Sequence, residues 1–190
     1  MTQTLLNFFY KYFLFIKNKN IILKDKLKEK NKPIIHVLDG SSLIIGNNVT
    51  LNSKNKKYHV NMFAPIKIYV DRIGAIIKIG ENTRIHGSCL HAYKAIEIGN
   101  NCLIAANCQI IDASGHDTYL DHPSKRINSK GVVKSVKIGN NCWIGTSTII
   151  LPGTILGNNC IIAAGSIVSG VFKENSLIAG NPAKFIKLVK

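Results

Sequence analysis

The sequence is poor in acidic residues and in aromatic residues. It has 10 Asp and Glu against 25 Lys and Arg, which gives a formal net charge of +15. Aromatic residues make up only 7% of the 190 residues, with a single Trp. An excess of positive charge favours anionic partners, such as phosphate-bearing cofactors, acidic glycans, an anionic membrane face or nucleic acid. Because no helix-turn-helix, zinc-finger or RNA-recognition motif accompanies the lysines, we expect no nucleic-acid partner.

Long hydrophobic runs are also missing, since no run reaches the roughly 20 residues that a transmembrane helix needs. Residues 1–16 are apolar but too short, and they lack the basic start and the cleavage site of a signal peptide. Residues 17–33 are rich in lysine and are predicted to form a solvated helix or linker. We therefore expect a helical N-terminal appendage over residues 1–33. It either packs on the β-helix or a neighbouring subunit, or contacts the membrane surface through residues 1–32.

A six-residue repeat dominates the second half of the sequence. A branched aliphatic residue recurs at every sixth position in Ile138, Ile144, Ile150, Leu156, Ile162 and Val168. This period fits neither an α-helix nor an alternating strand. It is typical of a parallel β-helix, an all-β fold in which three hexads form one coil of a triangular prism.

The same pattern extends upstream through a repeated corner. The tripeptide Gly-Asn-Asn or Gly-Glu-Asn follows Ile45, Ile79, Ile98, Ile138 and Leu156. Gly and Asn tolerate the left-handed backbone that such corners need. We therefore expect the β-helix to occupy residues 34–190 as one domain.

The cysteines contain no Cys-x-x-Cys pair, which argues against a zinc or redox site. Each lies four positions after a hexad aliphatic and is predicted to pack inside the prism as a small apolar residue (Cys89, Cys102, Cys108, Cys142 and Cys160). Unpaired cysteines favour a reducing, cytoplasmic setting.

The repeat is interrupted over residues 112–135, which contain no clear hexads. Long segments without regular structure are uncommon in compact domains and often carry function. This one contains His116, Asp117 and Arg126. We therefore predict an extruded loop that holds the chemistry, with the rigid prism fixing its base.

Five short motifs resemble the hexapeptide-repeat O-acetyltransferases, and within them the branch that acetylates sugars. They read Ile104-Ala105-Ala106-Asn107, Ser114-Gly115-His116-Asp117, Asn141-Cys142-Trp143-Ile144-Gly145, Ala163-Ala164-Gly165-Ser166 and Ala179-Gly180-Asn181-Pro182-Ala183-Lys184. The resemblance covers residues 75–190. It implies a left-handed β-helix, acetyl-CoA as the acetyl donor, no metal, and a homotrimer whose active sites lie between neighbouring prisms.

The resemblance also implies roles for individual residues. His116 matches the catalytic histidine, and an imidazole is suited to take the proton of a sugar hydroxyl near neutral pH. The positions that match contacts to CoA are Trp143, Gly145, Thr146, Ala164, Ser169, Lys184 and Lys187. On the acceptor side the family often has an Asn, and the motifs of this chain assign no equivalent to it. The candidates here are His86, Ser88, Asp117 and Arg126.

Two other functions remain open at this point. A zinc enzyme like the γ-class carbonic anhydrases needs three histidines around the metal, and His86 and His91 supply only two. A non-catalytic β-helix that scaffolds glycan assembly or binds nucleotides would have no need of His116. The favoured function is transfer of acetyl from acetyl-CoA to a sugar of surface polysaccharide, lipopolysaccharide or a precursor. The positive charge favours an anionic acceptor.

Overall fold

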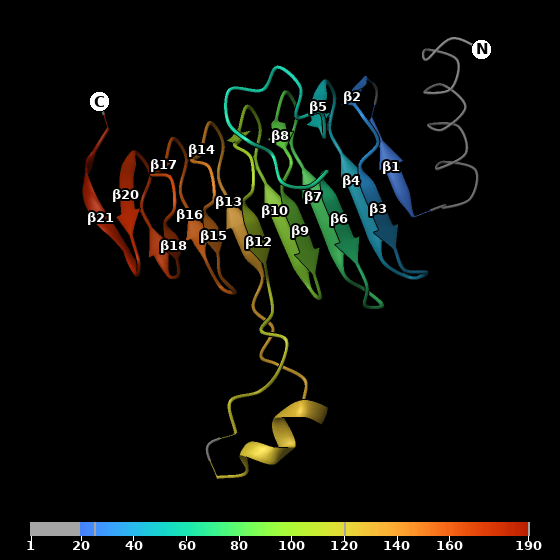
Figure 1. The fold of residues 1–190 in the computed structure, drawn as a ribbon, viewed down its shortest axis with the longest axis vertical. Helices are drawn as coiled ribbons and strands as arrows, with labels where there is room; N and C mark the ends of the chain where they lie inside the picture. Colours follow the sequence, from blue (N-terminus) through green and yellow to red (C-terminus); the bar gives the residue numbers. More distant parts are fainter. Residues whose placement is uncertain (1–19, 25, 120, 190) are drawn as a thin grey trace.

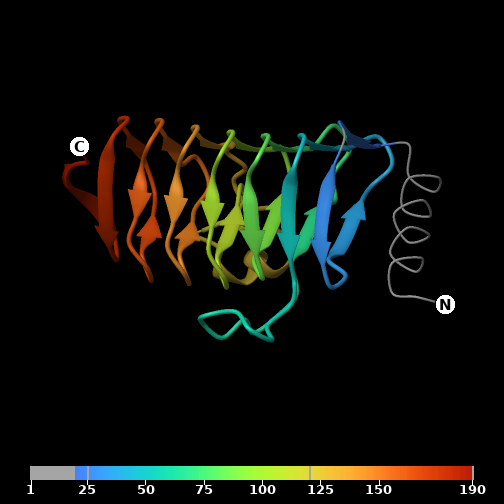
Figure 2. The same cartoon turned by 90° about the horizontal axis from the view of Figure 1, so that it is seen from above.

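The chain forms a three-sided prism of short parallel strands (Figures 1 and 2). The computed structural model describes residues 20–24, 26–119 and 121–189. Successive strands pass from one side of the prism to the next, and each strand pairs with strands of the coils before and after it. The predicted all-β architecture is therefore confirmed.

The three sheets are named A, B and C. Sheet A contains β1 (Ile21–Leu23), β4 (Ser42–Ile45), β7 (Ile76–Ile79), β10 (Ala95–Ile98), β13 (Val136–Ile138), β16 (Ile155–Leu156) and β19 (Val171–Phe172). Sheet B contains β2 (Leu27–Lys30), β5 (Val49–Asn52), β8 (Arg84–His86), β11 (Leu103–Ile104), β14 (Trp143–Ile144), β17 (Ile161–Ile162), β20 (Ser176–Gly180) and β21 (Ala183–Leu188). Sheet C contains β3 (Ile34–Val37), β6 (Lys67–Val70), β9 (Cys89–Ala92), β12 (Gln109–Ile111), β15 (Ile149–Ile150) and β18 (Ile167–Val168). All pairs are parallel except β20–β21, an antiparallel hairpin at the end of the prism.

The predicted corners lie between sheets A and B. The second Asn of each Gly-Asn-Asn corner has a positive φ, for example 56° at Asn101 and 57° at Asn141. The Asn side chains also join neighbouring coils, since the backbone N of Asn100 donates to Asn140 Oδ1 and that of Asn140 donates to Asn158 Oδ1, both at 2.8 Å. The corner sequence thus fixes the turn and the stacking together.

The core is one column of branched aliphatic side chains, as the hexads predict. Four cysteines are buried in it, and burial raises the pKa of Cys108 to about 11, so that thiol stays protonated. Cys89 departs from the prediction, because it is only half-buried and faces outward in register with Lys67 and Gln109. Its neighbour Ser88 fills the inward position instead, so this corner is one residue shorter than the hexad pattern predicts.

The lysine-rich N-terminal segment differs from the sequence prediction. Ile21–Leu23 and Leu27–Lys30 form the strands β1 and β2 of the first coil and not a helix or linker. Burial explains the difference, because Ile21 and Leu27 point into the core while the residues around them, Ile22 and the lysines at 24, 26 and 28, are exposed. The predicted helix over residues 1–16 lies outside the described residues. Among the described residues, no helix is long and apolar enough to cross a membrane.

Two loops leave the prism at different edges (Figures 1 and 2). The near loop, residues 53–66, connects β5 to β6 at the edge between sheets B and C. The far loop, residues 113–135, connects β12 to β13 at the edge between sheets C and A and contains the 3-10 helix η1 (Pro123–Asn128). The sequence pattern indicates the far loop in full, whereas in the near loop only the polar stretch 52–58 is predicted to be a loop.

Candidate active site

A groove of about 620 Å³ runs along the outer face of sheet B. Its lining comes from β8, β11, β14, β17 and the near loop. The groove runs perpendicular to the strands, so each coil of the prism contributes one strand to its length.

The strand register arranges the groove as two rows of outward residues. The first row is Arg84, Leu103, Trp143 and Ile161, one residue per coil. The second row lies two residues further along each strand and consists of His86, Ala105, Gly145 and Ala163. Because three members of the second row are Ala or Gly, the groove has a narrow floor beside the large Trp143 ring, which is 53% exposed.

Gly145 shows how tightly this floor is built. A Cβ atom at this position would lie 2.5 Å from the backbone N of Ala164 and 2.8 Å from Ile162 O. No side chain therefore fits at residue 145 without a shift of the next coil. The adjacent Thr146 is held by a hydrogen bond from its Oγ1 to Ala106 O at 2.8 Å.

Both rows continue to the C-terminal hairpin. Ile161 is in register with Leu177, which pairs with Lys187. The same register places the floor residue Ala163 beside Ala179 of β20, and Ala179 pairs with Lys184. Both lysines are exposed. The row from His86 to Lys184 spans five strand spacings, or about 24 Å.

The near loop closes the other end of the groove through contacts to its own prism. Asn107 holds it with two hydrogen bonds, from its Nδ2 to Asn61 O at 2.7 Å and from the backbone N of Phe63 to its Oδ1 at 3.0 Å. Met62 is buried against Gly87. The Tyr58 ring stacks on the His86 ring with centroids 4.7 Å apart.

His86 has a defined protonation state. Asn52 Oδ1 accepts a hydrogen bond from the backbone N of Lys54 at 3.0 Å, so the Asn52 amide turns its Nδ2 toward His86 Nδ1, 3.1 Å away. Nδ1 therefore acts as the acceptor, and the neutral ring carries its proton on Nε2. Burial, with the charges of Arg84, Lys30 and His59, lowers the pKa of His86 to about 4.

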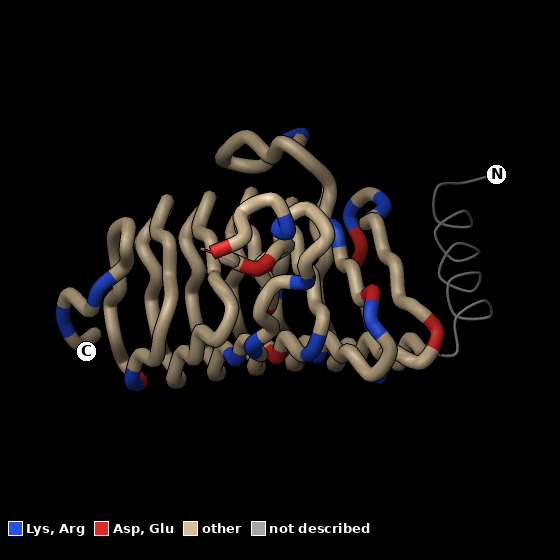
Figure 3. The backbone as a smooth tube through the Cα atoms, turned by 90° about the horizontal axis from the view of Figure 1, so that it is seen from below, with Lys and Arg blue, Asp and Glu red and all other residues tan. Residues whose placement is uncertain are grey.

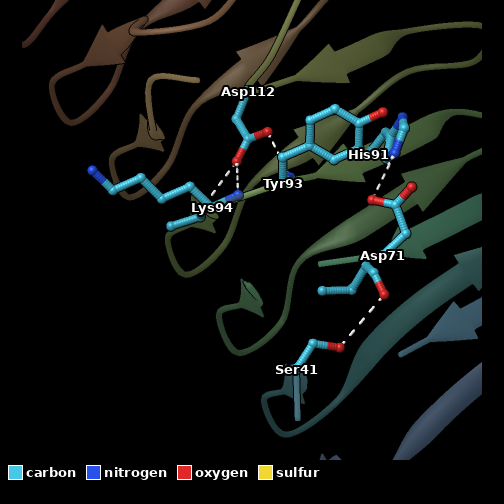
Figure 4. A network of polar contacts seen from close by, with 8 residues as sticks. Ser41, Asp71, His91, Tyr93, Lys94 and Asp112 are labelled. Carbon is cyan, nitrogen blue, oxygen red and sulfur yellow. Dashed lines mark hydrogen bonds and ion pairs between the residues drawn. The ribbon is translucent and has the colours of Figure 1, made fainter. Parts of the chain in front are cut away.

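The far loop is held at its base. The Asp112 carboxylate is fully buried and accepts hydrogen bonds from the backbone N of Tyr93, Lys94 and Ala95 at 2.7–2.8 Å (Figure 4). His91 lies beside this base on sheet C, with its Nε2 3.2 Å from Asp71 Oδ1. Beyond the base, His116 and Arg126 are exposed, and Arg126 donates to Tyr119 O within the loop.

One chain therefore brings together only part of the predicted site. The groove contains four of the predicted CoA contacts, namely Trp143, Gly145, Thr146 and Ala164, together with His86. His116, Asp117 and Arg126 lie on the far loop, which leaves the opposite edge of sheet C. Ser169, exposed directly after β18, does not line the groove.

Ser88 is a correction to the predicted acceptor site. The residue is 2% exposed, and its hydroxyl is 2.8 Å from both His86 O and Ala105 O inside the prism. It also accepts a hydrogen bond from the backbone N of Cys108 at 2.9 Å. Because these partners satisfy the hydroxyl, Ser88 is not retained as an acceptor contact.

The structure separates the two histidines on which the zinc alternative depends. His86 faces outward from sheet B and His91 from sheet C, so the two rings lie on different sides of the prism. Within the described part of the chain, no three His, Cys, Asp or Glu side chains gather as a metal site would require.

Three groove residues with polar or charged side chains were not predicted from the sequence. Tyr58 and His59 belong to the near loop, and Arg84 occupies the first row of the groove. The alternation in β8, where buried Ile85 separates Arg84 from His86, is the signal that both side chains face outward.

Positive charge is distributed over the molecule and is not gathered in one stripe. Figure 3 shows Lys and Arg along the coils, at the edges and on both loops, with few acidic residues between them. No lining residue of the groove is acidic among those that the structure describes. The groove therefore lies in a surface that attracts anions from several sides.

Comparison with known families agrees with this architecture. Residues 135–170 match the family described as bacterial transferase hexapeptide (six repeats), and residues 76–111 match the hexapeptide repeat of succinyl-transferase. A putative lipopolysaccharide biosynthesis O-acetyl transferase of Escherichia coli is 29% identical over 147 residues, covering 72% of this chain and 73% of that protein. The chain spans 32% and 58% of the length of two further relatives named as acetyltransferases.

Solved structures extend the similarity to three dimensions. A maltose O-acetyltransferase from Clostridium difficile is 32% identical with a TM-score of 0.54, and the match covers 66% of this chain and 67% of that one. A galactoside acetyltransferase in complex with coenzyme A is 28% identical with a TM-score of 0.61, covering 77% and 64%. The predicted fold class, a left-handed parallel β-helix, is confirmed. The chain belongs to the hexapeptide-repeat acetyltransferases.

Proposed function

We propose that this protein transfers the acetyl group of acetyl-CoA to a hydroxyl of a sugar in a surface polysaccharide, a lipopolysaccharide or a precursor of one. The observation that carries the proposal is the groove, with its Ala and Gly floor, the Trp143 ring beside it, and Lys184 and Lys187 in register at its end. A thin pantetheine arm fits such a floor, and lysines suit the phosphates of CoA. The names of the relatives that act on galactosides and lipopolysaccharide support a sugar acceptor.

His116 is the proposed general base. Its imidazole takes the proton of the sugar hydroxyl as the oxygen attacks the thioester carbonyl. The C–S bond then breaks, and the proton passes to the departing CoA sulfur. No enzyme nucleophile is needed, which agrees with cysteines that lie buried in the core.

The separation of His116 from the groove supports a homotrimer as the working unit. The groove and the near loop lie at one edge of sheet C, and the far loop leaves the other edge. A neighbouring copy placed around a threefold axis would bring its far loop to this groove. Asp117, Arg126 and Ser169 would then act in this shared site, as the family resemblance implies.

Two expectations about the setting remain part of the proposal. The five free cysteines favour the reducing cytoplasm. The net charge of +15 favours an anionic acceptor and contact of residues 1–32 with the inner membrane face. Equal turnover of neutral and anionic sugars without salt dependence would contradict the anionic acceptor.

The deciding experiment is release of CoA thiol from acetyl-CoA over a panel of sugars, with acetylated product identified by mass spectrometry. Release that needs a sugar and that falls at least about a hundredfold in His116→Ala supports the proposal. If the wild type binds CoA but transfers no more acetyl than His116→Ala does, the non-catalytic scaffold is favoured instead.

A further inference from the structure

One end of the groove differs chemically from the rest. Near Trp143 and Ala163 the lining is apolar, whereas the end built by β8 and the near loop presents Arg84, His86 and His59. None of the groove-lining residues that the structure describes can neutralise this end with a carboxylate. It is a basic recess at the opposite end from Lys184 and Lys187.

Arg84 is available for a ligand. Its side chain is exposed and lies in the same row as Trp143, two strand spacings or about 10 Å away. No Asp or Glu of the described residues forms an ion pair with it. The planar guanidinium offers paired N–H donors that match a carboxylate.

His86 supplies the second polar group of this recess. Its Nδ1 is used by Asn52, and its ring is held in place by the Tyr58 ring. The remaining ring atom, Nε2, carries the proton and forms no hydrogen bond with the described residues. A neutral imidazole fixed in this way donates a hydrogen bond and cannot take a proton from a hydroxyl.

We propose that this recess is the acceptor subsite and that it selects a sugar carrying a carboxylate. Arg84 binds the carboxylate, and His86 donates its Nε2–H to a hydroxyl or carbonyl oxygen of the same sugar. This assignment rests on the proposed acetyl transfer. It gives the two histidines separate tasks, because His86 orients the acceptor while His116 takes the proton.

The first test compares acidic sugars with matched neutral ones. The substrates are glucuronic acid against glucuronamide, and N-acetylneuraminic acid against its methyl ester. The wild type is expected to favour each acid by about tenfold or more in kcat/KM, since a hydrogen bond to a charged group is worth that much. Arg84→Gln should reduce the preference to about one, and Arg84→Lys should keep part of it.

The KM for acetyl-CoA distinguishes the two anions that Arg84 could bind, the carboxylate of the acceptor sugar and a phosphate of CoA. If Arg84 binds a phosphate of CoA, Arg84→Gln will raise the KM for acetyl-CoA and leave the ratio of acid to amide unchanged, which would overturn the assignment. The expected result is an unchanged KM for acetyl-CoA and a raised KM for the acid.

The second test reads His86 directly. In ¹⁵N NMR of the imidazole, His86 should show the Nε2–H neutral form at pH 7, and the acidic sugar should shift the Nε2 signal. His86→Phe keeps a ring beside Tyr58 but removes the donor, so acceptor kcat/KM should fall about tenfold or more while CoA binding is retained. A Nδ1–H form, or an unchanged kcat/KM in His86→Phe, would contradict the role.

These outcomes are distinguishable from failure of acetyl transfer itself. If the enzyme acetylates neutral sugars as well as acids, or neutral sugars alone, the subsite is wrong and the acetyltransferase stands. If none of the acids is acetylated while His116-dependent hydrolysis of acetyl-CoA persists, the subsite is likewise wrong. If the wild type does not bind CoA at all, the proposed function is overturned instead.

Discussion

The near loop and the far loop leave the same prism but are held in opposite ways. The near loop is tied to its own chain along its length, by Asn107, by buried Met62 and by the Tyr58–His86 stack. Among its described residues, the far loop is tied to the prism at its base, through Asp112 and the bridge between Ala113 and Val133.

Beyond its base the far loop is bonded to itself. The backbone N of Asp117 donates to Ser129 Oγ at 2.8 Å, and η1 contains no buried residue. Ile127 is 76% exposed. A segment that buries so little on its own chain has low local stability in a single chain. The contrast teaches that the near loop completes the groove of its own chain, whereas the far loop is built to serve another surface, which we propose is the groove of a neighbouring copy.

The sharpest way to break this contrast is to remove His116 from the far loop. His116→Ala should lower kcat by about a hundredfold or more, because general-base catalysis contributes that much. The dissociation constant of CoA, measured by calorimetry, should stay unchanged because the groove is intact. His122→Ala in the same loop is the matched control and should retain activity. Equal losses in both variants would assign the effect to loop structure and not to the imidazole.

Blocking the groove should produce the reverse pattern. Ala163→Phe places a ring on the narrow floor and should weaken CoA binding by about tenfold or more, since the site has no space to spare. The control is Val171→Phe on sheet A, where the side chain is 71% exposed and away from the groove. If both variants bind CoA like the wild type, the groove does not hold the cofactor.

Releasing the near loop should have a smaller and more local effect. Met62→Ala removes a buried side chain and should weaken the packing of the near loop by about 2 kcal/mol, at the low end for such changes. Hydrogen exchange of residues 53–66 should accelerate, while the sheets keep their protection. Phe63→Ala next to it removes an 82% exposed ring and should change little. Equal exchange in both variants would mean that Met62 does not anchor this loop.

A further expected effect is a pH dependence of stability from His86. Its pKa is about 4 in the folded chain and near 6.5 when unfolded, so the unfolded chain binds the extra proton between these values. The free energy of unfolding should therefore fall as the pH drops from 6.5 to 4, and this contribution should end below pH 4. Urea unfolding of His86→Gln should show a shallower slope over that interval. Identical slopes would mean that His86 is not shielded by the near loop.

The sequence predicts the prism well, because its physics is local and repeated. One buried aliphatic per hexad and one Asn at a positive φ per corner specify each coil without reference to distant residues, as Ile138 and Asn141 illustrate. The same logic explains two errors. Because residues 17–33 are rich in lysine, the sequence did not indicate that Ile21 and Leu27 are core residues of two strands. The corner at Gly87 is one residue shorter than the hexad pattern, so Ser88 and not Cys89 points inward.

The site is less predictable because it depends on contacts between distant segments. Trp143 and Gly145 are found by their motif, yet the role of Tyr58 depends on where the near loop folds back, which no hexad encodes. The tautomer of His86 depends on Asn52 and Lys54, more than 30 residues earlier. Which chain presents His116 to which groove is a property of the assembly and is not written in any local pattern.

Complementation between two impaired variants, assayed at acetyl-CoA concentrations below saturation, tests the central claim most directly. His116→Ala and Ala163→Phe would be co-expressed with different affinity tags, and mixed oligomers would be purified through both tags. If each site takes the groove of one chain and His116 of the next, every mixed trimer regains one intact site out of three, about a third of the sites, and acetyl transfer returns. If mixed oligomers form and stay as inactive as the separate variants, the groove and His116 do not share a site across chains, and the account is wrong.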